Sequence, residues 1–195
     1  MSIPQSAIDQ LFNNARTANG FLDKPVPLSL VQQIYDIAKM GSTSMNGQPA
    51  RYVILQTPQA KERLLPALSP GNVDKSRSAP VVVIVATDNR FYENMPELFP
   101  NNPNAKGLFE GNAALAAGTA TRNSTLSGAY FMIAARALGL DCGPMSGFDA
   151  AKVNAEFFPD GRCSVNFILN LGYGDNSKLF PRNPRLSFER ACTVL

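Results

Sequence analysis

The sequence contains no histidine and no tryptophan. Without an imidazole side chain, the histidine-dependent catalytic triads and most zinc hydrolase sites are excluded. Only three cysteines occur, and because Cys142, Cys163 and Cys192 include no close pair, neither a disulfide framework nor a thiolate zinc site is predicted. We therefore expect a cytoplasmic protein that holds no metal ion.

Charged residues are also scarce, at 17% of the 195 residues, and they are scattered along the chain. A formal net charge of +3 without a basic cluster argues against a nucleic-acid surface. No stretch reaches the roughly 20 apolar residues that a membrane helix needs, and residues 1–10 lack the features of a signal peptide. Length and a hydrophobic content of 45% predict a single domain over 1–195 that binds neither nucleic acid nor a membrane.

The spacing of apolar residues predicts helices that alternate with short strands, which is typical of an α+β or α/β domain. Two pairs with capping-box spacing, Ser2 with Gln5 and Ser29 with Gln32, predict the starts of the first two helices. These helices are expected to end near residues 15 and 41. Further helices are predicted over 61–68 and 124–140 and from a cap at Asp149 to Phe157, and strands over 52–56, 81–86 and 166–171.

The segment 89–105 combines prolines and asparagines with aromatic residues in no regular pattern. Such a composition predicts a long loop, and a lid over a site and a surface excursion fit it about equally well.

The sequence does not match two familiar catalytic motifs. The Gly172-Tyr173-Gly174 run lacks the third glycine of a dinucleotide-binding loop. Ser146 stands one position too late for a nucleophile elbow, and no histidine is available to activate it. The sequence thus argues against both a Rossmann-type site and an esterase.

Polar and cationic residues instead follow helix ends or turns in four stretches, where free backbone amides favour anions. They occur at 16–19, 42–48, 72–75 and 182–185. Taken singly, each residue is more typical of solvated surface or turn chemistry.

In their order along the chain, these stretches resemble the flavin-dependent nitroreductase family, over nearly the entire sequence. Residues 16–19 resemble its phosphate-binding arginine segment, and 42–49 its serine-rich stretch ending in Asn-x-Gln-Pro. Asn72 and Lys75 have the family's Asn-x-x-Lys spacing. Residues 143–149 resemble the segment that passes along the isoalloxazine ring, and the C-terminal arginines resemble its basic pair.

This resemblance implies a three-layer α/β/α fold with a central, mostly antiparallel sheet. It also implies a homodimer with flavin mononucleotide (FMN) at the interface, where Thr43 and Ser44 contact the opposite subunit's cofactor. Residues 190–195 look like a strand, for which pairing with the partner's sheet and fraying of the terminus are the two alternatives. NADH or NADPH would reduce the flavin in ping-pong turnover, and no side chain is assigned a catalytic role. The cofactor-binding residues implied are Arg16, Thr17, Asn19, Thr43, Ser44, Asn46, Gln48, Asn72, Lys75, Pro144, Met145, Ser146, Gly147, Arg182 and Arg185.

Within the family, residues 49–51 and 142–149 look most like the subgroup that includes malonic semialdehyde reductases, which form 3-hydroxypropanoate. Ala50 stands where many nitroreductases have tryptophan, and Ser146 replaces an acidic residue of some members. The resemblance to this subgroup implies a small aldehyde, such as malonic semialdehyde, as the acceptor. A broad nitro or quinone reductase and a non-catalytic flavin-binding module are the alternatives.

Overall fold

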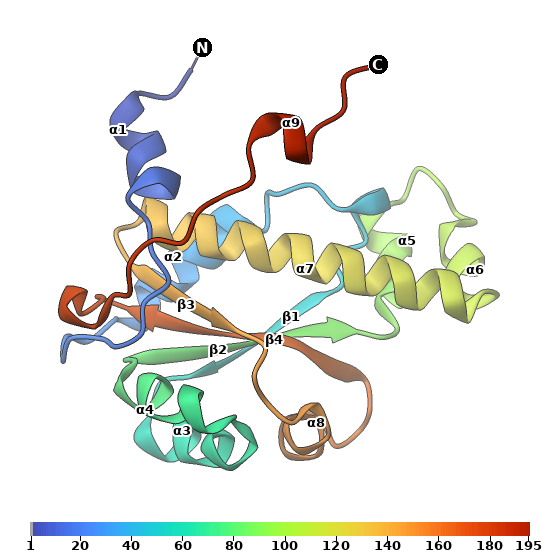
Figure 1. The fold of residues 1–195 in the computed structure, drawn as a ribbon. Helices are drawn as coiled ribbons and strands as arrows, with labels where there is room; N and C mark the ends of the chain where they lie inside the picture. The colour runs from blue at the N-terminus through green and yellow to red at the C-terminus, as the bar shows by residue number, and fades with distance from the viewer. Residues whose placement is uncertain (1) are drawn as a thin grey trace.

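The computed structural model describes residues 2–195 and is built around one antiparallel sheet (Figure 1). Its strand order is β1-β2-β4-β3, and every pairing is antiparallel. The strands are β1 (Ala50–Leu55), β2 (Val81–Asp88), β3 (Asp141–Met145) and β4 (Cys163–Gly172). Strand β2 is buried along its whole length, which explains its unbroken hydrophobic run.

Helices cover both faces of the sheet, so the predicted three-layer α/β/α architecture is confirmed (Figure 1). On one face lie α2 (Leu28–Ala38) and the long α7 (Ala113–Ala137), packed against the odd-numbered residues of β2. The other face is covered by α3 (Pro58–Leu64), α4 (Pro70–Ser78) and α8 (Ala150–Phe157). Alternate residues of a strand point to opposite faces, so β2 contributes to two separate cores.

The sequence located β1, β2, β4 and α8 to within a few residues but missed β3 and α4. Strand β3 contains Gly143 and Pro144, which are unfavourable in a strand interior and are tolerated here because β3 is an edge strand. Helix α4 begins with Pro70 and Gly71 and is mostly polar, so it shows no apolar stripe.

Both predicted capping boxes are wrong. The first helical segment comprises α1 (Gln5–Ile8) and a π-helical turn, Asp9–Asn13, and it starts after Pro4. Helix α2 likewise starts after Pro27, so Ser29 lies inside it, and it ends at Ala38 rather than near residue 41. In both places a proline with extended backbone precedes the helix, and no side chain caps its first turn.

The long loop predicted over 89–105 is also wrong. This stretch holds a 3₁₀ turn, Phe91–Asn94, followed by α5 (Met95–Leu98) and the start of α6 (Ala105–Glu110). Phe91 and Met95 are 0% and 1% exposed, and they pack with residues of α6 and α7 in a third core. The aromatic residues that looked irregular in sequence therefore meet through tertiary packing.

Two further differences concern the ends of elements. Helix α7 begins at Ala113, eleven residues before the prediction, because the Asn112 side chain caps its first turn by accepting a hydrogen bond from the Leu115 N–H. At the C-terminus, Arg190 lies in α9 (Phe188–Ala191) rather than in a strand, and extended backbone starts at Cys192. Short 3₁₀ turns complete the fold at Ser44–Asn46, Leu65–Ala67 and Asn176–Lys178.

Candidate functional site

The arginine segment at 16–19 lies beside strand β3. The Ala18 N–H donates to the Cys142 carbonyl at 3.0 Å, and Thr17 forms an isolated bridge with the same residue. A Cβ atom on Gly143 would stand 2.7 Å from the Ala18 carbonyl oxygen, so the close approach of the two backbones requires glycine there. The N-terminal segment is thereby fixed against the strand that leads into 144–147.

A cavity of about 760 Å³ opens next to this junction. Its walls come from residues 12–19, the C-terminal end of α7 and residues 180–185. Four arginines line it, and no aspartate or glutamate does. The predicted residues that it brings together are Arg16, Thr17, Asn19, Arg182 and Arg185.

Hydrogen bonds to backbone carbonyls hold these guanidinium groups in place. Arg16 Nη2 donates to the Phe180 carbonyl, and Arg182 Nη2 donates to the Asn13 and Ala15 carbonyls at 2.6 and 3.0 Å. These bonds join the C-terminal segment to the N-terminal one, which is why both contribute to a single cavity.

Arg136, at the end of α7, is the fourth arginine of the cavity. Its Nη1 donates to the Leu11 carbonyl at 3.0 Å, while its buried Nε has no hydrogen-bond partner among residues 2–195. Four cations without a carboxylate among them repel one another, and a buried donor without an acceptor is costly. Both features fit a site for an anion, and phosphate takes forked hydrogen bonds from arginine.

The segment 144–147 continues from this cavity toward α4. Asn72 Nδ2 donates to the Gly147 carbonyl at 2.7 Å, and the Ser69 N–H donates to the same oxygen at 3.0 Å. Lys75 lies one helical turn beyond Asn72 and is half-buried, and its desolvation lowers the pKa of its ammonium group. The exposed Ser146 N–H has no acceptor among residues 2–195. One free donor, the Ser146 N–H, and the Lys75 cation are thus found in these two segments, where Met145 is buried and Pro144 is half-buried.

The predicted residues of the 43–48 turn lie elsewhere. The Ser44 N–H donates to Asn123 Oδ1 at 2.8 Å. Asn123 lies on α7, and because an α-helix rises about 1.5 Å per residue, it is about 20 Å from Arg136 along the helix axis. Asn46 and Gln48 use their side chains within the fold, because Asn46 Nδ2 donates to the Leu98 carbonyl and Gln48 Nε2 donates to Asn46 Oδ1. Within one chain, this turn does not share the arginine-lined cavity.

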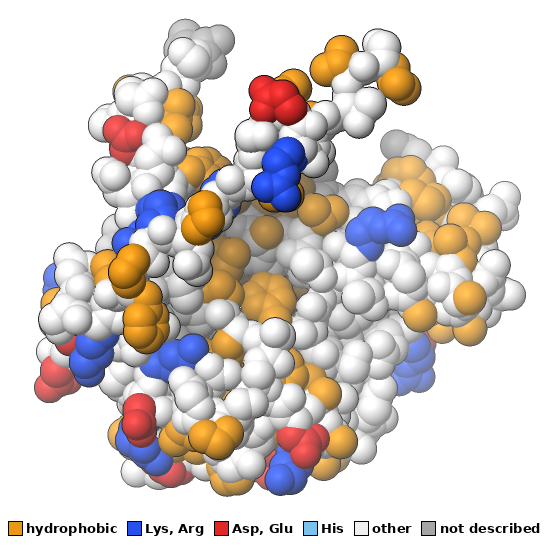
Figure 2. Space-filling view, viewed as in Figure 1, with side chains coloured by type: hydrophobic (Ala, Val, Ile, Leu, Met, Phe, Trp, Pro, Cys, Tyr) orange, Lys and Arg blue, Asp and Glu red, His pale blue; other side chains and the backbone are white. Residues whose placement is uncertain are grey.

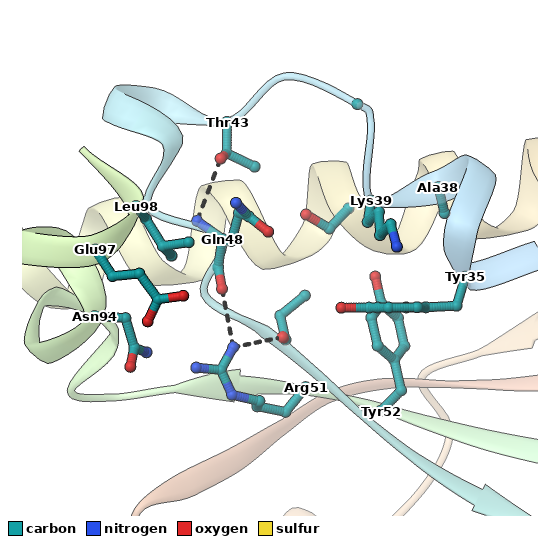
Figure 3. A pocket seen from close by; sticks show the side chains of 13 residues that line it. Tyr35, Ala38, Lys39, Thr43, Gln48, Arg51, Tyr52, Asn94, Glu97 and Leu98 are labelled. Carbon is teal, nitrogen blue, oxygen red and sulfur yellow. Dashed lines mark hydrogen bonds between the residues drawn. The ribbon is translucent and has the colours of Figure 1, made fainter. Parts of the chain in front are cut away.

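A smaller cavity of about 270 Å³ adjoins this turn, between α2, β1, α5 and α7 (Figure 3). Its cations are already engaged, since Lys39 pairs with Asp36 and Arg51 pairs with Asp88. Tyr35 and Tyr52 form its other side in Figure 3, and burial raises the pKa of the Tyr52 hydroxyl. The phenol therefore stays protonated in the neutral range.

Among the described residues 2–195, none of the helices is both long and apolar enough to span a membrane. No cluster of three or more cysteine or carboxylate side chains in this range is arranged to hold a metal ion.

The sequence matches a family model described as the nitroreductase family over residues 12–173, which includes all four strands and most of the positions discussed above. The chain belongs to the nitroreductase family. Two relatives carry provisional names as NADH dehydrogenase/NAD(P)H nitroreductases. One, from Ralstonia nicotianae, is 55% identical over 194 residues, which cover 100% of this chain and 99% of the relative. The other, from Stenotrophomonas maltophilia, is 53% identical over 193 residues, 99% and 98% of the two chains.

Solved structures of nitroreductases share the fold at low sequence identity. The ydfN protein of Bacillus subtilis superimposes with a TM-score of 0.89 at 23% identity, over 98% of this chain and 100% of that chain. A provisionally named nitroreductase from Exiguobacterium sibiricum, crystallised with FMN, gives 0.86 at 17% identity, over 100% and 98%. The α+β nitroreductase fold is thus established for this chain.

Sequence reasoning missed two residues that shape the site of this nitroreductase. Arg136 is a basic residue in the last turn of a helix, where arginine is common for local reasons, so nothing marked it as part of a cavity. Asn123 is a buried polar residue within α7 and holds the Ser44 amide. A polar position on the buried face of a long helix was the only signal available for it.

Proposed function

We propose that this nitroreductase-family protein is an NAD(P)H-dependent flavoenzyme that binds FMN in the arginine-lined cavity and along 144–147. The single observation that carries the proposal is the cavity itself, with four arginines, no acidic side chain and the unpartnered Nε of Arg136. A cavity of about 760 Å³ is in the usual range for a small ligand. The FMN complex of the Exiguobacterium protein, which shares the fold, supports the choice of cofactor.

In this proposal the arginines hold the phosphate. A phosphate monoester carries about −1.5 to −2 charges near neutral pH, so Arg16, Arg182 and Arg185 bind it through charge-assisted hydrogen bonds. Arg136 adds a further positive charge at the same wall. Thr17 and Asn19 add polar contacts from the segment that is fixed against β3.

The residues around 72–75 and 144–147 orient the ring system. Asn72 is held against the Gly147 carbonyl, and Lys75 places a positive charge where electron density increases on reduction. The Ser146 N–H is free to donate to a ring nitrogen, and Pro144 limits the mobility of the chain before it. The bound flavin supplies the chemistry, which is acceptance of a hydride from NADH or NADPH and its donation to a second substrate.

We also propose a cytoplasmic homodimer with the cofactor at its interface. The 43–48 turn is about 20 Å from the arginine cavity along α7, which supports the proposal that Thr43 and Ser44 contact a flavin bound by the other subunit. Strand β1 is an edge of the sheet and is flanked by a groove of about 620 Å³ lined by residues of α2 and β1. The C-terminal segment ends in exposed apolar residues and projects from the surface, as Figure 2 shows. In this proposal, residues 192–195 of a second copy pair with that open edge.

The acceptor that we propose is malonic semialdehyde, reduced to 3-hydroxypropanoate by transfer of a hydride and a proton in a ping-pong cycle. The resemblance of 49–51 and 142–149 to the subgroup of malonic semialdehyde reductases supports it. The small Ala50 side chain, in place of a ring, is consistent with a small acceptor that needs no stacking surface.

The test is a visible spectrum of the purified protein after FMN addition and desalting. We expect a retained flavin band that bleaches anaerobically with NADPH or NADH and returns on addition of malonic semialdehyde. A nitroarene and a quinone are run in parallel as competing acceptors.

Each outcome bears on a different part of the proposal. Return of the band with the nitroarene or quinone but not with the aldehyde would replace the acceptor. A retained band that neither nucleotide bleaches would indicate a binding module, and no retention at all would remove the assignment of the cavity.

A further inference from the structure

The turn that carries Thr43 and Ser44 has an unusual backbone. Met45, Asn46 and Gln48 have positive φ angles of 52°, 51° and 40°, although none of them is glycine. Residues with side chains rarely adopt this region, so the surrounding contacts must enforce it. Strained backbone of this kind is concentrated at functional sites, which makes the contacts that enforce it informative.

Gln48 is held at both of its backbone polar groups. Its N–H donates to Thr43 Oγ1 at 3.2 Å, and its carbonyl accepts a hydrogen bond from Arg51 Nη1 at 2.9 Å (Figure 3). The same Nη1 also donates to the Ala50 carbonyl at 2.8 Å. The Arg51 guanidinium therefore fixes the end of the turn, and the Gln48 backbone connects this guanidinium to the Thr43 hydroxyl.

Arg51 is itself fixed by a buried carboxylate. Asp88, the last residue of β2, is 1% exposed, and its Oδ2 lies 2.7 Å from Arg51 Nη2. Arg162 approaches the same carboxylate, with its Nε 2.7 Å from Asp88 Oδ1. Its Nη2 donates to Asp88 Oδ2 at 3.1 Å, and its other side-chain bonds go to the Glu93 carboxylate and the Arg90 carbonyl, so Arg162 shares the anchor without touching the turn.

We propose that Arg51 is a positioning residue that sets the direction in which the Thr43 hydroxyl donates. Because Thr43 Oγ1 accepts the Gln48 N–H, its own proton is not used in that bond and is available to a ligand. Arg51 maintains this arrangement by holding the Gln48 carbonyl from the buried Asp88. The inference rests on the proposed function, in which that ligand is the flavin bound by the other subunit.

The experiment compares Arg51→Met with Arg162→Met in the full-length protein. Each variant leaves Asp88 with one cation fewer, so both should lower the melting temperature of the apoprotein, and Arg162→Met should do so at least as much because Arg162 makes two bonds to Asp88 and also pairs with Glu93. Only Arg51→Met should weaken FMN binding, by about tenfold, measured from the quenching of flavin fluorescence. Arg51→Lys keeps a charge for Asp88 but lacks the planar fork that reaches the Asp88 carboxylate and the Gln48 carbonyl together, so it should fold normally and show an intermediate affinity.

A double-mutant cycle with Thr43→Val separates positioning from general damage. If Arg51 acts through Thr43, Arg51→Met should have almost no further effect on FMN affinity once the Thr43 hydroxyl has been removed. The visible circular dichroism of the bound flavin should change in both single variants and not change further in the double variant.

Equal loss of FMN affinity in Arg51→Met and Arg162→Met, or additive effects with Thr43→Val, would overturn the inference. Should Arg51→Met fail to fold, the cycle is run with Arg51→Lys. FMN binding by the wild-type protein distinguishes failure of the Arg51 positioning role from failure of the proposed function. If it retains FMN while the Arg51 variants bind normally, only the positioning role fails; if it binds no FMN, the proposed function fails with it.

Discussion

At the scale of single residues, the candidate site is distinguished by arginines that have no acidic side chain among them. Arg16, Arg136, Arg182 and Arg185 meet at one cavity that no carboxylate lines. In contrast, Arg51 and Arg162 share the buried Asp88. The first group is available to an external anion, whereas the second serves the structure. Sequence alone could not separate the two groups, because arginine looks the same in both roles until its partners are known.

Arg16→Ala tests the first group. Losing a charge-assisted bond to phosphate should weaken FMN binding by about 10- to 100-fold, because hydrogen bonds to charged groups are worth about 1.5–3 kcal/mol. Isothermal titration calorimetry measures the change. Arg63→Ala is the control, since Arg63 is an exposed residue of α3 paired with Glu156; equal affinity in both variants would remove Arg16 from the site.

Lys75 gives a prediction that depends on pH. Desolvation lowers its pKa in the folded protein, so between that value and the ordinary 10.5 the unfolded chain binds more protons. The free energy of unfolding of the apoprotein should therefore rise with pH in this window, and Lys75→Met should abolish that contribution. Urea unfolding at a series of pH values measures both proteins, and parallel curves would contradict the assignment.

The same variant should change the bound cofactor. Without the Lys75 charge, the reduced flavin loses electrostatic stabilisation, so its reduction potential should fall by a few tens of millivolts. An anaerobic dye-equilibration titration measures the potential, and an unchanged value would place Lys75 away from the ring.

At the scale of elements, the sequence was most successful where hydrophobic periodicity is strong. It located β2, β4 and α8, and it failed at β3 and over 89–105. Strand β3 could not be recognised because it contains Gly143 and Pro144, and the close approach of the Ala18 backbone requires glycine at position 143. The 89–105 stretch folds because Phe91 and Met95 meet distant side chains of α6 and α7, and no local pattern contains that information.

Phe91→Ala tests whether the segment 91–110 packs as part of the folded core. Because Phe91 is fully buried against Phe109 and beneath Gly47, its truncation should destabilise the protein by about 3–5 kcal/mol. Leu108→Ala, in the same segment at an exposed position, should change stability by less than about 1 kcal/mol. Chemical denaturation compares the two, and equal small effects would restore the prediction of a loop.

At the scale of the whole molecule, the arrangement of the predicted residues points to two copies. One chain brings 16–19, 72–75, 144–147 and 182–185 to adjoining elements, and it leaves 43–48 near the middle of α7. The same chain has an open edge at β1 and a projecting C-terminal segment in which Val194 is 82% exposed. In the proposed homodimer, a second copy completes both features.

Deletion of residues 192–195 tests the proposed dimer. Without the extended segment, the β1 edge has no strand to pair with, so the protein should dissociate at micromolar concentration and lose FMN affinity by about tenfold or more. Sedimentation velocity and FMN titration measure these two effects. Removal of residues 2–4, which are also exposed, is the matched control. A truncated protein that remains dimeric would exclude this mode of pairing.

The sequence by itself determined the family, and it predicted most of the residues that we propose to bind the anionic cofactor. Composition excluded histidine chemistry, and the order of the 16–19, 42–49, 72–75 and 143–149 stretches carried the resemblance. Only the tertiary structure decided which of those residues meet, that Arg136 joins them, and that Arg51 and Asp88 hold the 43–48 turn. The physical reason is that a motif records local chemistry, whereas the partners of a charged side chain come from segments far away in the chain.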